Sequence, residues 1–122
     1  MITGKFPSLR LRRSRKRDWS RRLIQENNLT PNDFILPIFI IDGKNKKQPI
    51  KSMPDVYRYT LDKLSFVVDK AIKKKLPMVA LFPHTEIRKK NSLGSEALNE
   101  DNLVCRAIQL IKKKFKNFLR IN

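Results

Sequence analysis

Two short runs of consecutive apolar residues constrain the fold of this chain more than any other feature. FILPIFII at residues 34–41 and MVALF at residues 78–82 each have the length of a strand. Such runs are typical of strands that are covered on both faces, as in a parallel sheet between layers of helices. Pro37 interrupts the first run. Because proline cannot donate to a strand ladder, we expect this strand to take an irregular or initially unpaired position.

Each run is followed by the pattern of an amphipathic helix. We expect Thr60 to cap a helix that ends at Lys73–Lys75, and Asn99 to cap a second helix. A third strand is expected to start at about Phe118. Both helices carry an apolar stripe with i, i+3, i+4 spacing, formed by Leu61, Leu64, Val68, Ala71 and Ile72 in the first and by Val104, Ala107, Ile108, Ile111 and Phe115 in the second.

A shorter helix is expected near the amino terminus, at residues 18–27. Asp18 would cap it, and its apolar residues Trp19, Leu23 and Ile24 are expected to be buried on one face. This helix would lie within a basic segment, so its apolar face would need a surface to pack against.

Turn signals divide the rest of the chain. Thr30–Pro31 predicts a turn with proline at a first helical position. After the Asp42–Gly43 turn, Gln48–Lys51 is expected to return as a short hairpin partner, and SMPDVYRY, residues 52–59, is expected to be a loop.

The expected order is strand, helix, strand, helix, strand, which is typical of parallel β-α-β units with right-handed crossovers. Two α/β folds fit this order: a doubly wound sheet and the start of a TIM (β/α)8 barrel. A three-stranded parallel sheet keeps bare edges, whereas a full barrel takes roughly 250 residues. We therefore expect the amino-terminal part of a longer protein, with a basic arm at residues 1–30 and a partial barrel at residues 31–122 that ends in its third strand.

The charge of the chain is concentrated in its first segment. The 122 residues include 28 Lys and Arg against 11 Asp and Glu, a net charge of +17. Residues 5–22 alone hold nine basic residues and one acidic residue, a balance of +8. Such a block is usually an exposed arm that orders against an acidic partner, and charge alone does not say whether that partner is nucleic acid, membrane or protein.

The composition also bears on compartment and metal content. Cys105 is the single cysteine, so no internal disulfide can form, and no Cys/His cluster has the spacing of a closed zinc site. The amino terminus lacks the apolar segment of a signal peptide, and no run approaches the roughly 20 apolar residues of a membrane span. We expect a cytoplasmic protein.

Individual candidates for chemistry are few. His84 follows the second strand, and with no nearby Cys, Asp or Glu partner it is expected to be an ordinary surface residue. Cys105 falls beside an apolar stripe and is expected to be a small core residue. Gly94–Ser95 predicts a turn, since no phosphate-binding glycine motif accompanies it. Phe82–Pro83 ends the second strand, where a complete barrel has its active-site mouth.

Several ordered segments resemble the delta-aminolevulinic acid dehydratase family, also called porphobilinogen synthase. RLRRSRK resembles its arginine-rich arm. LTPNDFILPIFIIDGKNKKQPIKSMPDVYRY is similar to its L-T-x-x-D-L-I-x-P-x-F-V stretch and the following x-P-I-x-S-M-P-G-V-x-R motif. MVALFP and GSEALNEDNLVCRAI resemble its second barrel strand and its G-S-x-A-x-x-x-x-G-L-x-x-R-A-I stretch, and KKFKNFL resembles the entry to its third strand.

The resemblance implies a cytosolic lyase with a TIM barrel that condenses two 5-aminolevulinate molecules to porphobilinogen. It also implies zinc or magnesium in the full-length enzyme. The family's arm wraps a neighbouring subunit, commonly in a homo-octamer. On the matching motif, Arg10, Arg12 and Arg13 would then serve assembly through ion pairs and fork-like hydrogen bonds.

No catalytic residue and no metal ligand is carried over from the family. Its two Schiff-base lysines and its metal-binding loop lie beyond the matched segments, and FLRIN at residues 118–122 has lost register with the family's next motif. A Schiff-base lysine must be desolvated, whereas the lysines here lie in charge runs or at expected helix ends. We expect no synthase activity from this chain alone.

A small basic nucleic-acid-binding protein is the rival hypothesis. In that case the arm would neutralise phosphates, and the lysine-rich helix ends would widen the basic patch. This hypothesis accounts for the charge but not for the two apolar strands and the matching helical stripes. The sequence also lacks helix-turn-helix spacing and stacking aromatics along a strand.

Overall fold

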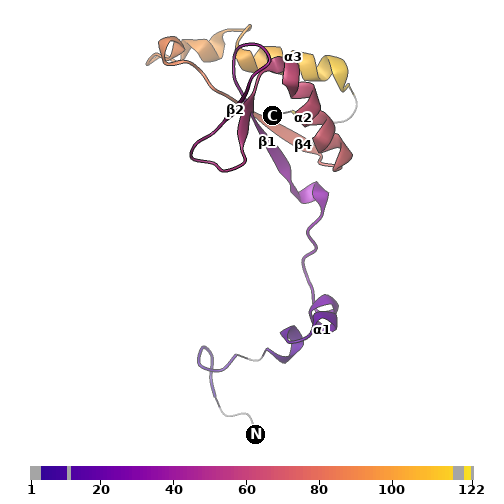
Figure 1. The fold of residues 1–122 in the computed structure, drawn as a ribbon. Coiled ribbons are helices and arrows are strands. Elements are labelled where there is room, and N and C mark those ends of the chain that lie inside the picture. The colour runs from indigo at the N-terminus through magenta and orange to yellow at the C-terminus, as the bar shows by residue number, and fades with distance from the viewer. Residues whose placement is uncertain (1–3, 11, 117–119, 122) are drawn as a thin grey trace.

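A small mixed sheet with helices on one face forms the folded part of the chain (Figure 1). The structure, a computed structural model, describes residues 4–10, 12–116 and 120–121. Within these residues the sheet has the order β2-β3-β1-β4-β5, and every neighbouring pair is parallel except β2–β3. The strands are β1 (Ile35–Ile40), β2 (Lys47–Pro49), β3 (Tyr57–Tyr59), β4 (Met78–Pro83) and β5 (Arg120–Ile121).

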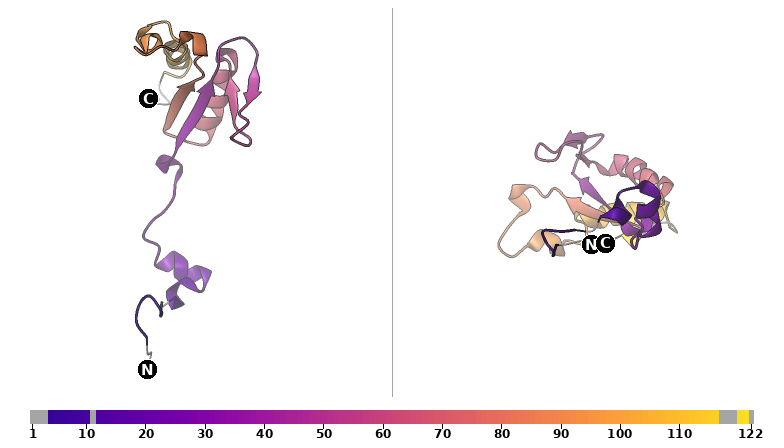
Figure 2. Two further views of the ribbon diagram at one scale, coloured as in Figure 1. Left: turned by 90° about the vertical axis from the view of Figure 1, so that its left-hand side faces the viewer. Right: turned by 90° about the horizontal axis from the view of Figure 1, so that it is seen from below.

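Two long helices, α2 (Leu61–Lys73) and α3 (Leu103–Lys114), cover one face of the sheet (Figures 1 and 2). Because side chains alternate along a strand, every second residue of β1 and β4 points toward these helices. Ile40, Val79 and Leu64 are fully buried in the resulting core. The core residues are Ile38, Ile40, Leu64, Val68, Ala71, Val79, Leu81, Leu103, Ala107 and Ile111.

The other face of the sheet is uncovered in the part of the chain that the structure describes. Ile35 and Phe82 on this face are 56% and 48% exposed, and the ring of Phe39 lies 5.5 Å from that of Phe82. The expectation that the first apolar run is covered on both faces is therefore wrong for the described residues. The pattern reports the hydrophobicity of both faces, whereas burial depends on whether a second layer is present.

Pro37 lies where its missing N–H leaves no ladder bond unmade. Ile40 accepts a bond from His84 on the β4 side, and Ile41 donates to Tyr59 on the β3 side. Since backbone groups alternate in direction along a strand, the nitrogen of Pro37 points to the β3 side. Pro37 is paired in register with Ala80 of β4, and pairing with β3 begins only at Phe39. The strand lies inside the sheet, so the expectation of an unpaired position is wrong on the β4 side and fits only the β3 side of Pro37.

The expected hairpin has a different partner. β2 pairs with β3 in antiparallel fashion, Gln48 opposite Arg58, and not with β1. The predicted loop at residues 52–59 therefore ends in a strand, and that strand pairs with β1 in parallel. A turn closed by the bond from the Ile50 N–H to the Val56 carbonyl reverses the chain here, which the alternating Tyr57–Tyr59 could have signalled.

The helix boundaries differ from the expectation at α3. Its N-cap is Asn102, whose side-chain oxygen accepts the Cys105 N–H at 2.9 Å, so the prediction of Asn99 is wrong. Asn99 instead follows the 3-10 turn Ser95–Leu98 and accepts the N–H of Asp101. Asn99 and Asn102 are both suitable N-cap residues. The helix begins after Asn102 because this start buries Leu103 in the core.

The amino-terminal arm leads away from the sheet (Figure 2). It contains the 3-10 turn Arg13–Arg15 and the helix α1 (Asp18–Leu23). The N-cap is Arg17 and the helix ends at Leu23, so the predicted cap Asp18 and the predicted end at residue 27 are wrong. Leu23 is 78% exposed, and Trp19 and Ile24 are exposed as well, so their predicted burial is wrong. Within the part of the chain that the structure describes, this six-residue helix lies far from the core and has no surface to pack against.

Two remaining expectations concern turns and the third strand. Thr30 and Asp33 form a capping box around a 3-10 turn that begins at Pro31, as predicted. The predicted start of the third strand at Phe118 lies outside the described residues. Of this region β5 is described, and it pairs in parallel with Met78 and Val79 of β4.

Candidate functional site

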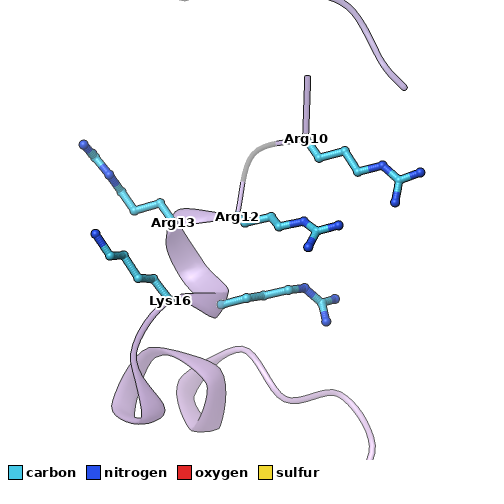
Figure 3. A pocket seen from close by; sticks show the side chains of 5 residues that line it. Arg10, Arg12, Arg13 and Lys16 are labelled. Carbon is cyan, nitrogen blue, oxygen red and sulfur yellow. The ribbon is translucent and has the colours of Figure 1, made fainter. Parts of the chain in front are cut away.

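The arm carries the densest charge of the molecule. Arg10 and Arg12 point to one side of the chain, and Arg13 and Lys16 point to the other (Figure 3). All four side chains are exposed, and with Arg15 they line a broad, open depression. The 3-10 turn separates successive cations in direction, so the arm presents basic groups on both sides.

Few of these cations have an acidic partner within the arm. Asp18 pairs with Arg22 at 3.1 Å and with Arg21 at 3.7 Å, and these side chains are more than 60% exposed. Among the described residues, no carboxylate lies within salt-bridge distance of Arg10, Arg12 or Arg13. The arm thus combines uncompensated positive charge with the exposed apolar side of α1. Such an arm suits a partner surface that carries both acidic and apolar side chains.

A second feature lies at the carboxyl ends of β1 and β4. The β4–α3 loop, residues 84–102, borders a pocket of about 250 Å³ that is lined by Asp42, His84 and Glu96 among others. His84 donates its backbone N–H to the Ile40 carbonyl at 2.7 Å and exposes its side chain to solvent. Phe82–Pro83 also lies at this end and is exposed.

Four charged side chains meet beside this pocket. Arg106 donates to Asp42 at 2.7 Å, and Lys89 lies 3.6 Å from the other oxygen of Asp42. Lys89 also lies 3.5 Å from Glu96. This network was not predicted from the sequence. Asp42 and Arg106 are 64 residues apart, and no local spacing pattern predicts a contact between them.

The other sequence candidates stay separate from this network. Cys105 is half-buried in α3, less than expected for a core residue. Gly94 adopts a left-handed conformation with φ of 63° just before the 3-10 turn at Ser95, which fits the predicted turn. No group of three or more His, Cys, Asp or Glu among the described residues is placed to hold a metal ion.

Comparison with known proteins decides the family. Residues 8–122 match the family model described as delta-aminolevulinic acid dehydratase. This chain belongs to that family. The resemblance read from the sequence is thereby confirmed, and the family's enzymes are metalloenzymes.

Individual relatives agree with this assignment. A delta-aminolevulinic acid dehydratase of Bradyrhizobium diazoefficiens is 46% identical over 108 residues, which are 88% of this chain and 31% of that protein. The enzyme of Chlamydia pneumoniae is 36% identical over 115 residues, 94% of this chain and 35% of that protein. The chain thus spans about a third of the length of these relatives and matches their amino-terminal part.

A solved structure matches the fold as well. The crystal structure of the enzyme from Toxoplasma gondii ME49, in complex with its reaction product porphobilinogen, superposes with a TM-score of 0.74 at 34% sequence identity. The match covers 93% of this chain and 32% of that one. The mixed α/β sheet therefore resembles part of the porphobilinogen synthase fold. None of the described helices is long and apolar enough to cross a membrane.

Proposed function

We propose that this chain forms the amino-terminal part of a porphobilinogen synthase, a lyase that condenses two 5-aminolevulinate molecules to porphobilinogen in haem and tetrapyrrole biosynthesis. The observation that carries the proposal is the family match over residues 8–122. The likeness to a synthase solved with porphobilinogen supports it. A cytoplasmic location is part of the same proposal, on the ground that its single cysteine suits a reducing compartment.

In this proposal residues 1–30 are the arm and residues 31–122 are the first part of a TIM barrel. The strands β1, β4 and β5 are then the first three barrel strands, with α2 and α3 as crossovers. Two features support this: their parallel pairing, and the uncovered apolar face around Phe39 and Phe82, which a closed barrel would place inside. The carboxyl ends of β1 and β4 would belong to the catalytic rim.

The chain alone is proposed to be inactive. A lysine that forms a Schiff base needs desolvation, and no described lysine is buried. The described residues also offer no cluster of metal ligands, so they do not fit the zinc or magnesium that the family resemblance implies. Both the reactive lysines and the metal ligands are expected in the part of the family's length that this chain does not span.

A chimera tests the proposed function. Residues 8–122 would replace the matched segment of the Bradyrhizobium diazoefficiens enzyme, and porphobilinogen formation from 5-aminolevulinate would be measured for the chimera and for this chain alone. We expect activity from the chimera only. A chimera that folds and assembles but forms no product would contradict the family function, and product from the 122-residue chain would contradict its inactivity.

The arm is proposed to join subunits into a homo-oligomer, commonly an octamer in the family. The uncompensated charges of Arg10, Arg12 and Arg13 support this role, because guanidinium groups can bind carboxylates with two parallel hydrogen bonds. In the chimera, changing all three to Gln is expected to reduce the assembly size measured by light scattering. Changing Lys73–Lys75 to Gln removes equal charge at the end of α2 and is the matched control. Equal assembly in both variants would exclude the role.

Nucleic-acid binding is the alternative function, since the same exposed cations suit a phosphate backbone. A gel shift with duplex DNA at physiological ionic strength distinguishes the two. Complex formation that weakens steeply with salt and is lost when Arg10, Arg12 and Arg13 are changed to Gln would favour the alternative. Absence of a shift would reject the nucleic-acid alternative and leave the synthase proposal as the remaining function.

A further inference from the structure

The β4–α3 loop has almost no apolar attachment to the rest of the fold. Its large apolar residues Ile87, Leu93 and Leu98 are 87%, 86% and 83% exposed. Every residue from 86 to 101 is exposed except Lys89 and Glu96, and the structure describes all of them. Hydrophobic packing therefore does not hold this segment in place.

The two half-buried residues of the loop are members of the charged network. Lys89 lies in the 3-10 turn Ile87–Lys89, and Glu96 lies in the later 3-10 turn of the same loop. Lys89 joins Glu96 to Asp42. Asp42 lies two residues after the end of β1. Asp42 also binds Arg106 of α3, so one carboxylate connects the end of β1 with both the loop and the helix.

Hydrogen bonds to backbone carbonyls extend this attachment. The side-chain amide of Asn102 donates to the Glu96 carbonyl at 3.4 Å, and Arg106 donates to the Asp101 carbonyl at 3.2 Å. The two oxygens of Asp42 each face a different cation, so removing its charge would leave Lys89 and Arg106 without that partner.

We propose that Asp42 is a positioning residue that holds the β4–α3 loop against the carboxyl ends of β1 and β4, through Lys89 on the loop and Arg106 on α3. Its importance for the catalytic rim rests on the proposed function, because a (β/α)8 barrel has its active site at this end of its strands. The attachment of the loop does not depend on that function.

Hydrogen exchange on the 122-residue chain tests this role directly. The amides of Lys89, Ala97 and Asn99 are bonded within the loop and report its opening. In Asp42→Asn, which keeps the shape and removes the charge, we expect these amides to exchange roughly five- to tenfold faster, since the ion pairs of Asp42 with Lys89 and Arg106 are lost together. Amides of α2 are expected to keep their protection.

Two variants serve as controls. Asp69→Asn makes the same chemical change on α2, where no ion pair of Asp69 occurs among the described residues, and is expected to leave the loop unchanged. Asp42→Glu keeps the charge and is expected to restore most of the loop protection. Unchanged loop exchange in Asp42→Asn, or equal acceleration in α2 and the loop, would overturn the proposal.

A measurement without substitution covers the case in which Asp42→Asn fails to fold. Raising the salt concentration from about 0.1 M to 1 M shortens the Debye length from about 10 Å to about 3 Å and weakens half-exposed ion pairs. Loop exchange in the unaltered chain should then accelerate while α2 stays protected, and salt-independent exchange would overturn the proposal. An inactive chimera together with salt-sensitive loop protection would reject the synthase function and retain the role of Asp42.

Discussion

At the scale of single residues, the carboxylate of Asp62 at the start of α2 holds the β1–β2 loop through Asn45, 17 residues earlier in the sequence. The oxygens of Asp62 lie 3.1 and 3.2 Å from the backbone nitrogen of Asn45, which adopts a left-handed φ of 54°. The Thr60 side chain and the Asn45 N–H lower the pKa of Asp62 below its ordinary value of 3.8. The Thr60 hydroxyl donates its proton to the Lys46 carbonyl. The Asn45 N–H is therefore the better defined donor to the Asp62 carboxylate.

Acid should therefore release this loop. A lowered folded-state pKa means that the contribution of Asp62 is complete above its unfolded value, about pH 4, and is lost as pH falls through the lowered pKa. We expect the NMR shift of the Asn45 amide to titrate below about pH 4 in step with the Asp62 carboxyl. Asp62→Asn should abolish that titration. An Asn45 amide that titrates equally in the variant would contradict the assignment.

At the scale of elements, the packing of α2 on the sheet supplies stability that helical propensity cannot. Leu64 is 0% exposed at the centre of this contact, and deleting most of its side chain leaves a cavity. We expect Leu64→Ala to lower the free energy of unfolding by about 2–5 kcal/mol in urea denaturation. Leu93→Ala makes the same change at an 86% exposed position and should cost less than about 0.5 kcal/mol. Similar losses in both would contradict the described core.

At the scale of the whole molecule, the open sheet face and the free strand edges favour self-association. We expect sedimentation velocity of the 122-residue chain to show concentration-dependent oligomers. Phe82→Lys, on the uncovered face, should weaken this association about tenfold or more, because a charge opposes apolar contact. Phe66→Lys, at a 61% exposed site on α2, is the matched control. A monomer that unfolds cooperatively at every concentration would contradict this expectation.

The sequence by itself determined the local elements and the family. The apolar runs gave β1 and β4 within one residue at most of the expected ends, and the stripes gave α2 and α3, because strand and helix periods are properties of neighbouring residues. The turn at Pro31 followed from local capping chemistry in the same way.

Only the tertiary structure decided which competing local options were used. Asn102 replaced Asn99 as a cap because Leu103 packs in the core, and Tyr57–Tyr59 became a strand because β1 offered a free edge. Trp19 stayed exposed because no surface among the described residues covers it. The Asp42 network joins residues far apart in sequence, and local patterns carry no information on such contacts, since they arise only when the sheet brings its strand ends together.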